Sequence, residues 1–247
     1  MGIEHTLFED ILRRIINELS LEELPEPVPF FSCAGFFGRV PDMAVVRVYR
    51  GEKIERLVHV QLNSRLLGLT SNMLYAFTPA ESVLPHFTLD VVKRGGTYGL
   101  HCDLIPRTSV GTMQPAYFGD VYLPLLSLYL KTDNLPGLKR CRLRDQQREL
   151  MSPQLLCYMA SREDKYAQLE GPVAAYLEQW FKLLDTGVKY DHAGLAPGAS
   201  VENDRLHRSL IFSPSIDPVW MLVALLVGRK NEAKIRACLT EPLSVAT

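Results

Sequence analysis

The sequence predicts an α+β fold in which helices cover an antiparallel sheet. Alternating strand patterns fill much of the first half of the chain, and helical patterns fill most of the second half. The connections between the strands are also too short to hold crossover helices. No internal repeat, low-complexity segment or linker divides the 247 residues, so we expect one domain over residues 1–247.

The first half predicts one helix and a series of strands. Apolar residues recur at helical spacing over residues 5–20, with charged residues on the opposite side. Residues 44–49 and 55–61 alternate between apolar and polar side chains, and the short polar segment between them predicts a hairpin. Residues 65–78 are mixed and predict no definite element.

The second half is mainly helical. Residues 123–130 are strongly apolar, residues 138–150 resemble a basic helix, and residues 154–159 predict a short strand. Residues 171–184 form a good helical pattern with Pro172 at its start. A loop is expected next, over residues 188–200.

Two further helices are expected before the end of the sequence. Residues 202–211 have a helical pattern, and Asp217 followed by Pro218 is typical of a helix start. The last helix then extends to about Leu239. Gly228 lies inside it and is expected to bend or split it.

The chain is organised around residues 85–122, which predict two paired strands and a loop that leads into a helix. Gly95 and Gly96 form a tight turn between these strands. Asp90 lies five residues before that turn and His101 five residues after it, so simple pairing places them opposite each other on one face. A carboxylate on a face suited to burial is costly unless it is paired, protonated or functional. The two side chains are therefore candidates for proton transfer.

Composition restricts the classes of partner and compartment. The net charge of −1 indicates no general attraction to nucleic acid. No apolar run reaches the roughly 20 residues that a membrane-spanning helix needs. The first helix contains acidic residues, unlike a secretory signal. The five cysteines are scattered and form no CxxC pair, which favours reduced thiols in the cytoplasm.

Common cofactor and nucleophile motifs are missing from the sequence. It contains no GxGxxG, GxxxxGK[ST], HExxH or GxSxG pattern, and its six histidines form no pair with metal-binding spacing. From the residues alone, the sequence thus predicts an α+β domain with an Asp/His pair in its sheet.

Five short segments resemble the ferredoxin-dependent bilin reductases and the related red chlorophyll catabolite reductases. Residues 100–107 (LHCDLIPR) and 118–120 (FGD) resemble bilin reductase segments. Residues 85–90 (PHFTLD) resemble the Pro-x-Phe-x-x-Glu segment of the chlorophyll catabolite branch. Residues 171–174 (GPVA) and 203–205 (NDR) are also similar to that branch. The likeness extends over about residues 40–240, and it is specific in three short segments that occur in the right order.

The resemblance implies a three-layer α/β/α sandwich with a central antiparallel sheet flanked by helices. A linear tetrapyrrole would lie between the sheet and the C-terminal helices. The family binds no metal or flavin of its own, and reduced ferredoxin supplies single electrons to the pigment. Acidic side chains supply the protons. Because the electrons arrive one at a time, the intermediates are radicals.

The resemblance also implies roles for particular residues. Asp90, His101, Asp120 and Asp204 correspond to acidic and imidazole groups that hold or protonate the pigment. The propionate groups of the pigment would need cationic partners at the rim of the pocket. The candidates for these partners are Arg107, Lys93 and Arg208.

Structural explanations remain open for each of these acids and for the histidine. Asp90 also suits an exposed sheet face, and His101 suits a core histidine bonded to a backbone carbonyl. Asp120 also suits a helix N-cap, and Asp204 suits the first turn of a helix. Asp103 shares the face of His101 and is expected to be structural.

The sequence leaves the substrate and the reaction open. Asp90 is one methylene shorter than the Glu of the chlorophyll branch, so the two branches are not separated. A tetrapyrrole carrier without chemistry, or an enzyme that uses the same pocket for another small molecule, are the alternatives. A basic stretch offers either a docking surface for acidic ferredoxin or a solvated face. Its charged residues are Lys139, Arg140, Arg142, Arg144 and Arg148.

Overall fold

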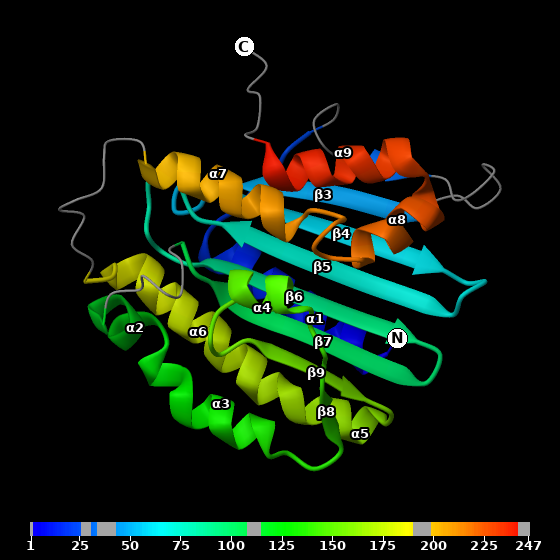
Figure 1. Cartoon of the computed structure of the whole chain (residues 1–247), viewed down its shortest axis with the longest axis horizontal. Helices are drawn as coiled ribbons and strands as arrows, with labels where there is room; N and C mark the ends of the chain where they lie inside the picture. The colour runs from blue at the N-terminus through cyan, green and yellow to red at the C-terminus, as the bar shows by residue number, and fades with distance from the viewer. Residues whose placement is uncertain (1, 26–30, 34–42, 108–114, 190–198, 242–247) are drawn as a thin grey trace.

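The computed structural model describes residues 2–25, 31–33, 43–107, 115–189 and 199–241. Within these residues, nine strands form one sheet in which all neighbouring strands are antiparallel. Helices lie on both faces of the sheet (Figure 1). The predicted α/β/α sandwich is confirmed.

The strand order in the sheet is β1-β3-β4-β5-β6-β7-β9-β8, and β2 also pairs with β3. Five consecutive strands, β3 to β7, therefore form a meander with short connections. The strands are β1 (Glu22–Glu23), β2 (Phe31–Cys33), β3 (Ala44–Arg50), β4 (Arg56–Ser64), β5 (Leu69–Phe77), β6 (His86–Arg94), β7 (Thr97–Ile105), β8 (Leu138–Arg140) and β9 (Leu156–Ala160).

The helices are divided between the two faces of the sheet. Those associated with one face are α1 (Ile3–Glu18), α2 (Pro115–Val121), α3 (Leu126–Asp133), α5 (Glu163–Tyr166) and α6 (Glu170–Thr186). Those on the other face are α4 (Asp145–Leu150), α7 (Ala199–Ile211), α8 (Val219–Val227) and α9 (Arg229–Thr240). Short 3-10 turns, η3 (Leu123–Leu125) and η4 (Ala167–Leu169), precede α3 and α6.

The structure confirms the first helix and the two predicted hairpins, β3–β4 and β6–β7. It adds a strand that the sequence pattern did not predict, β5, within residues 65–78. Most of β5 is buried on both faces, because it lies in the middle of a sheet with helices on each side. A strand of this kind lacks the apolar–polar alternation that identifies a half-exposed strand.

The stretch 138–150 is not one basic helix. It contains the edge strand β8 followed by the short helix α4. The predicted strand at 154–159 corresponds to β9, which pairs with β7 on one side and β8 on the other. The last helix is split at Gly228, whose φ of 85° belongs to the left-handed region that favours glycine.

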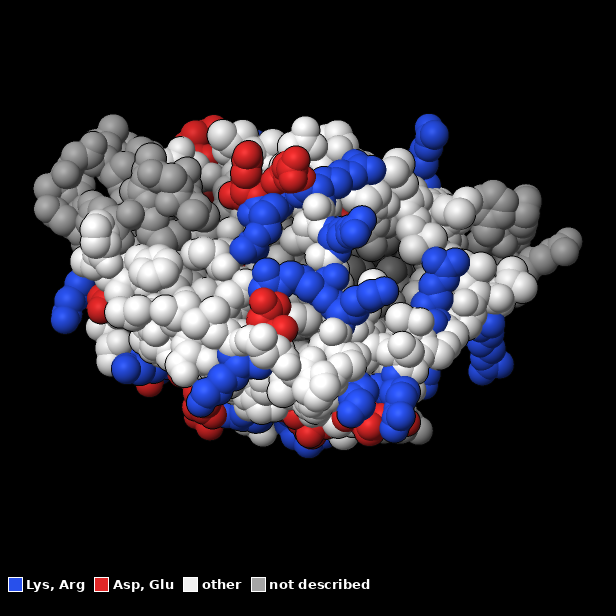
Figure 2. Space-filling model, turned by 60° about the horizontal axis from the view of Figure 1, so that its bottom comes forward, with Lys and Arg blue, Asp and Glu red and all other residues white. Residues whose placement is uncertain are grey.

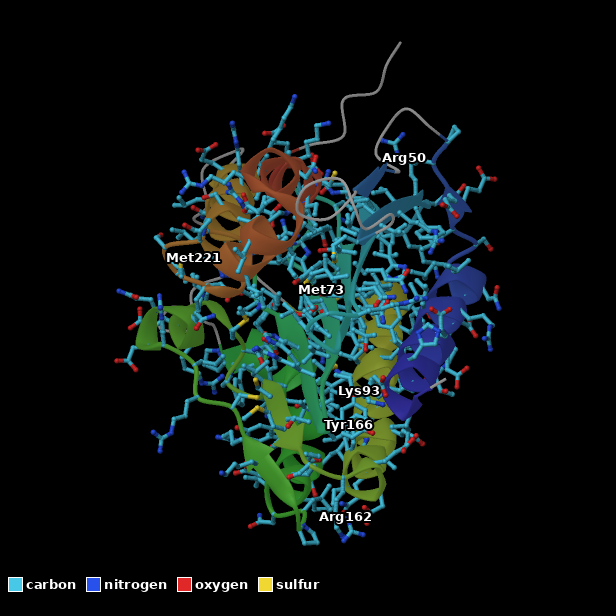
Figure 3. The ribbon with its side chains drawn as sticks, turned by 90° about the vertical axis from the view of Figure 1, so that its right-hand side faces the viewer. Arg50, Met73, Lys93, Arg162, Tyr166 and Met221 are labelled. Atoms are coloured by element: carbon cyan, nitrogen blue, oxygen red, sulfur yellow. The ribbon has the colours of Figure 1, made fainter. Side chains whose placement is uncertain are left out.

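Each face of the sheet has its own apolar core. On the α1 and α6 side, the buried indole of Trp180 packs on Phe87 and donates a hydrogen bond of 2.9 Å to the Pro85 carbonyl. On the α7–α9 side, Phe212 packs edge-on against both Tyr75 and Trp220. Figure 3 shows the two helical layers on either side of the sheet. Among the described residues, no helix has the length and apolarity needed to cross a membrane.

Candidate functional site

Asp90 and His101 lie opposite each other in the β6–β7 pair, as the turn geometry predicts. Both side chains are partly buried on the sheet face that α4 and α7–α9 cover. The Oδ1 atom of Asp90 and the Nε2 atom of His101 are buried and have no hydrogen-bond partner. Burying polar atoms without hydrogen-bond partners is costly, so these two atoms indicate a place where a bound ligand supplies the missing partners.

A small cavity of about 40 Å³ lies over this pair. The sheet supplies its floor, and α4 with the segment between α7 and α8 supplies its cover. Its lining residues are Tyr75, Thr88, Asp90, His101, Ile105, Leu143, Gln147, Met151, Ile211, Phe212 and Asp217. Apolar walls with a few convergent ionisable groups are typical of a small-molecule site.

Hydrogen bonds hold the cover of the cavity together. The Gln147 side chain of α4 bonds to the Asp217 carboxylate in front of α8. Arg144 reaches the Ser215 carbonyl at 3.5 Å. His207 of α7 donates to the Leu150 carbonyl at 3.0 Å, which joins α7 to the end of α4. The two parts of the cover, α4 and the segment between α7 and α8, therefore move together unless these hydrogen bonds break.

Asp217 brings a second carboxylate to the cavity, which the sequence analysis did not assign to the site. It lies one residue before Pro218, which is the N-cap of α8, and its Oδ1 accepts a hydrogen bond from the Val219 amide at 3.0 Å. The same side chain lines the cavity above Asp90. An N-cap signal locates such a residue along the chain but does not reveal what lies across from it.

Burial shifts the pKa values of the ionisable side chains that line the cavity. It raises the pKa of Asp90 well above its usual value, and the nearby Asp217 carboxylate raises it further. Burial also raises the pKa of Asp217. The pKa of His101 is lowered by burial to about 4, so the imidazole is neutral near pH 7. The site thus combines an acid whose protonated form is favoured by burial with a neutral imidazole, which is the arrangement of a proton donor beside a hydrogen-bonding base.

Asp103 shares the face of Asp90 and His101 but has a structural role. Its fully buried carboxylate accepts hydrogen bonds from the Ser152 amide, at 2.8 Å, and from the Ser152 hydroxyl. These bonds fix the chain directly after α4 to the middle of β7. Burial raises the pKa of Asp103 to about 6, against the opposing effect of the Ser152 bonds.

The unfolding free energy should therefore depend on pH through Asp103. Its pKa is higher in the folded chain than in the unfolded chain, so between about pH 4 and pH 6 the folded state binds more protons and stability falls as the pH rises. In Asp103→Asn, the fall in unfolding free energy across this pH range should be smaller by about 2–3 kcal/mol than in the native protein. Urea unfolding at several pH values across the range measures it. Asp10→Asn, at an exposed ion pair on α1, is the control. Identical pH profiles for the native protein and Asp103→Asn would contradict the assignment.

Asp204 lies on α7 and faces the sheet at His86, within the same covered face as Asp90. It forms ion pairs with Arg107 at 2.9 Å and Arg208 at 2.6 Å, and His86 Nε2 donates to it at 2.8 Å. The hydrogen bond from His86 and the two guanidinium groups hold the pKa of Asp204 well below its usual value, although burial opposes them. The carboxylate is thus kept ionised, which suits an anchor between α7 and the sheet better than a proton donor. Because α7 begins at Ala199, Asp204 is also not in the first helical turn.

Arg107 and Arg208 do not form a cationic rim. Arg107 is buried and donates to the Thr78 hydroxyl and to the carbonyls of Pro79 and Ala80. Arg208 is buried over the Phe77 ring and also pairs with a glutamate on the chain before β4. Both guanidinium groups are already occupied within the protein, which corrects the expectation that they bind propionates.

Lys93 lies on the opposite face of the sheet from Asp90. Its ammonium group is 4.0 Å from the Glu4 carboxylate of α1 and 5.0 Å from the centre of the Tyr98 ring. Figure 3 shows Lys93 on the α1 side and Met73, which pairs with Asp90, on the side of α8. Alternation along β6 separates Lys93 from the cavity, so the rim role expected for it is corrected as well.

Asp120 is not brought to the cavity. It lies near the end of α2, where its carboxylate accepts a hydrogen bond from the Lys189 amide at 2.7 Å. Its backbone carbonyl accepts one from Gln179 of α6 at 2.7 Å. These contacts place it with the α6 layer, on the other side of the sheet from Asp90. Asp120 is inside a helix, so the N-cap alternative is wrong too.

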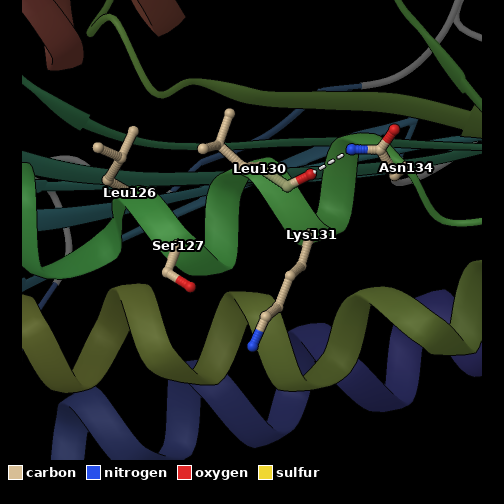
Figure 4. Close-up of a pocket in the computed structure, with 5 residues that line it drawn as sticks. All are labelled: Leu126, Ser127, Leu130, Lys131 and Asn134. Atoms are coloured by element: carbon tan, nitrogen blue, oxygen red, sulfur yellow. Dashed lines mark hydrogen bonds between the residues drawn. The ribbon is translucent and has the colours of Figure 1, made fainter.

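A larger open groove of about 600 Å³ lies along α3 (Figure 4). It is lined by Leu126, Ser127, Leu130, Lys131 and Asn134. Among the residues that the structure describes, Lys131 is the only ionisable residue in its lining, and none of the lining residues is an acid. The smaller cavity over Asp90 is therefore the better candidate for chemistry. The described residues contain no cluster of three or more side chains suited to hold a metal ion.

Comparisons with known proteins support the fold. No protein-family model and no curated protein sequence matches this chain. A crystal structure with the same fold is that of phytochromobilin synthase from tomato in complex with biliverdin, with a TM-score of 0.74 and 17% sequence identity. The match covers 97% of this chain and 83% of that chain. The fold implied by the resemblance to bilin reductases is therefore confirmed.

Proposed function

We propose that this chain binds a linear tetrapyrrole over Asp90 and His101 and reduces it with electrons from ferredoxin. The observation that carries the proposal is the pair of unpartnered atoms, Asp90 Oδ1 and His101 Nε2, beneath a cavity that a second carboxylate also lines. The related fold of the tomato enzyme holds biliverdin, which is a linear tetrapyrrole.

The proposed chemistry matches the protonation of the site. Reduction of one double bond consumes two electrons and two protons, and ferredoxin delivers the electrons one at a time. Asp90, held protonated by burial, supplies a proton to the pigment radical. Asp217 is placed to supply the other, and neutral His101 is placed to accept a pyrrole N–H or donate to a lactam oxygen. No cofactor held by the chain enters this scheme.

Substrate binding requires the cavity to open. Small-molecule sites usually enclose about 300–1,000 Å³, far more than the 40 Å³ found here. The element best suited to move is α4, which is only six residues long and has no buried residue. Separation of the Gln147–Asp217 and Arg144–Ser215 contacts would lift it from the sheet.

The basic residues predicted as a docking surface lie in and next to α4. All five are exposed and belong to β8, to α4 or to the segment between them. Figure 2 shows Lys and Arg side chains across the middle of one face of the molecule, with Asp and Glu side chains among them. A positive surface favours encounter with an acidic electron carrier. The set consists of Lys139, Arg140, Arg142, Arg144 and Arg148.

An anaerobic absorbance titration tests the proposal. Biliverdin, and separately a red chlorophyll catabolite, is added to the protein, followed by photoreduced ferredoxin. We expect a red-shifted bound spectrum that bleaches or shifts to the blue as electrons arrive. Binding without reduction would support a carrier instead. No spectral change with either pigment would show that the fold serves another substrate class.

A further inference from the structure

Cys141 and Cys157 are neighbours across the outermost strand pair of the sheet. The register of β8 and β9 pairs Arg140 with Tyr158, so the next residues, Cys141 and Cys157, are opposite each other. The Cys141 amide donates to the Cys157 carbonyl at 2.9 Å. Opposed residues of antiparallel strands that share such a hydrogen bond have Cα atoms about 5.5 Å apart, within the range that a disulfide spans.

The two thiols are reduced and in contact with each other. Both cysteines are free, and their side chains share a hydrogen bond. That hydrogen bond from Cys157 lowers the pKa of the Cys141 thiol, while the same interaction raises the pKa of Cys157. Cys141 is only partly buried, so it is the more accessible and more acidic thiol of the pair.

The pair borders the candidate active site. Cys157 lies opposite His101 in the β7–β9 register, so Asp90, His101, Cys157 and Cys141 form one row across the sheet. The two cysteines line a cavity of about 120 Å³, and Leu143 lines both this cavity and the one over Asp90. The charged residues around the thiol cavity are Arg140, Asp145 and Arg148.

We propose that Cys141 and Cys157 form a reversible disulfide that locks the cover of the active site. A peroxide is the oxidant: the Cys141 thiolate attacks one peroxide oxygen, which gives a sulfenic acid and releases hydroxide. The Cys157 thiol then displaces water from the sulfenic acid and forms the S–S bond. In total two thiols and one hydrogen peroxide give one disulfide and two waters. A dithiol reductant reverses the step.

The crosslink would act on the element that has to move. Only three residues separate Cys141 from α4, and both Leu143 in this connection and Gln147 in α4 form part of the cover. A bond from Cys141 to β9 would hold the start of the cover against the sheet. That this slows substrate access rests on the proposed function, whereas the disulfide and the locking of α4 do not.

The test measures the disulfide and the mobility of α4 without any pigment. The full chain is treated with a modest excess of hydrogen peroxide and digested without reduction. We expect a crosslinked peptide that joins Cys141 to Cys157, lighter by about 2 Da than its two reduced parts. Amide hydrogen exchange over residues 141–151 should then be about tenfold slower in the oxidised protein than in the reduced protein.

Matched variants make the outcome decisive. Cys141→Ser should abolish both the crosslink and the slower exchange, while Cys238→Ser on α9 should retain both. Failure to form the crosslink, or a crosslink between a different pair of cysteines, would overturn the proposal. A crosslink with unchanged exchange over α4 would overturn the locking. The outcome of the pigment titration does not depend on either result.

Discussion

Asp90→Asn should bind a linear tetrapyrrole with little loss of affinity but reduce it about 10²- to 10⁴-fold more slowly. The amide keeps the size and polarity of the carboxyl group, so contacts with the pigment remain. It has no acidic proton to give to the radical formed by the first electron. Single-turnover reduction by photoreduced ferredoxin, followed by absorbance, measures the rate, and a titration in the dark measures the affinity.

Lys93→Gln is the matched control for this experiment, because it changes the same strand on the opposite face. It should leave pigment turnover unchanged. Undiminished turnover in Asp90→Asn would contradict the role of Asp90 as proton donor. Equal losses in both variants would indicate damage to β6 rather than to the chemistry.

Asp90→Asn should also stabilise the protein. The pKa of Asp90 is raised on folding, so the folded state holds its proton above the pH at which the unfolded chain has lost it. The contribution of this group to the unfolding free energy therefore falls as the pH rises above about 4. Removing the acid should raise the unfolding free energy near pH 7 by on the order of 1 kcal/mol. Such an exchange of stability for reactivity is common at functional sites.

Asp204→Asn should lower the unfolding free energy by about 3–5 kcal/mol. The change leaves the buried guanidinium groups of Arg107 and Arg208 without their shared carboxylate. The pKa of Asp204 is lowered in the folded state, so its contribution is present above about pH 4 and is lost as the pH falls below that value. Urea unfolding at pH 7 measures the difference.

The control for Asp204→Asn is Asp185→Asn. Asp185 pairs with Lys53 at 2.6 Å, but the two side chains are 62% and 52% exposed, so its loss should cost less than about 1 kcal/mol. If Asp204→Asn has native stability but loses turnover, Asp204 is a catalytic acid, as the resemblance to the bilin reductases implies, and not an anchor.

The sequence was sufficient for the contacts that a local turn determines. Gly95 and Gly96 fix the register of β6 and β7, and this register alone brings Asp90 to His101. It was insufficient where distant segments meet. The Asp204–Arg107 pair joins residues almost a hundred positions apart, and it depends on how α7 lies on the sheet. Asp217 reaches the cavity for the same reason.

Motif order also failed to show on which face a residue lies. Asp120 follows the paired strands closely in sequence, but α2, which carries it, lies on the α6 side of the sheet. The assignment of 138–150 to one helix failed because a three-residue edge strand carries too little pattern to be distinguished from the helix after it.

The position of β9 between β7 and β8 affects the order in which the nascent chain is completed. β8 is synthesised before β9, but in the sheet it has no partner until β9 has emerged and paired with β7. The meander from β3 to β7 has no such delay, because each strand finds its neighbour as soon as it is made. On the ribosome, the floor that carries Asp90 and His101 is therefore assembled first. The β8–α4 cover is added only after about fifty further residues have been made.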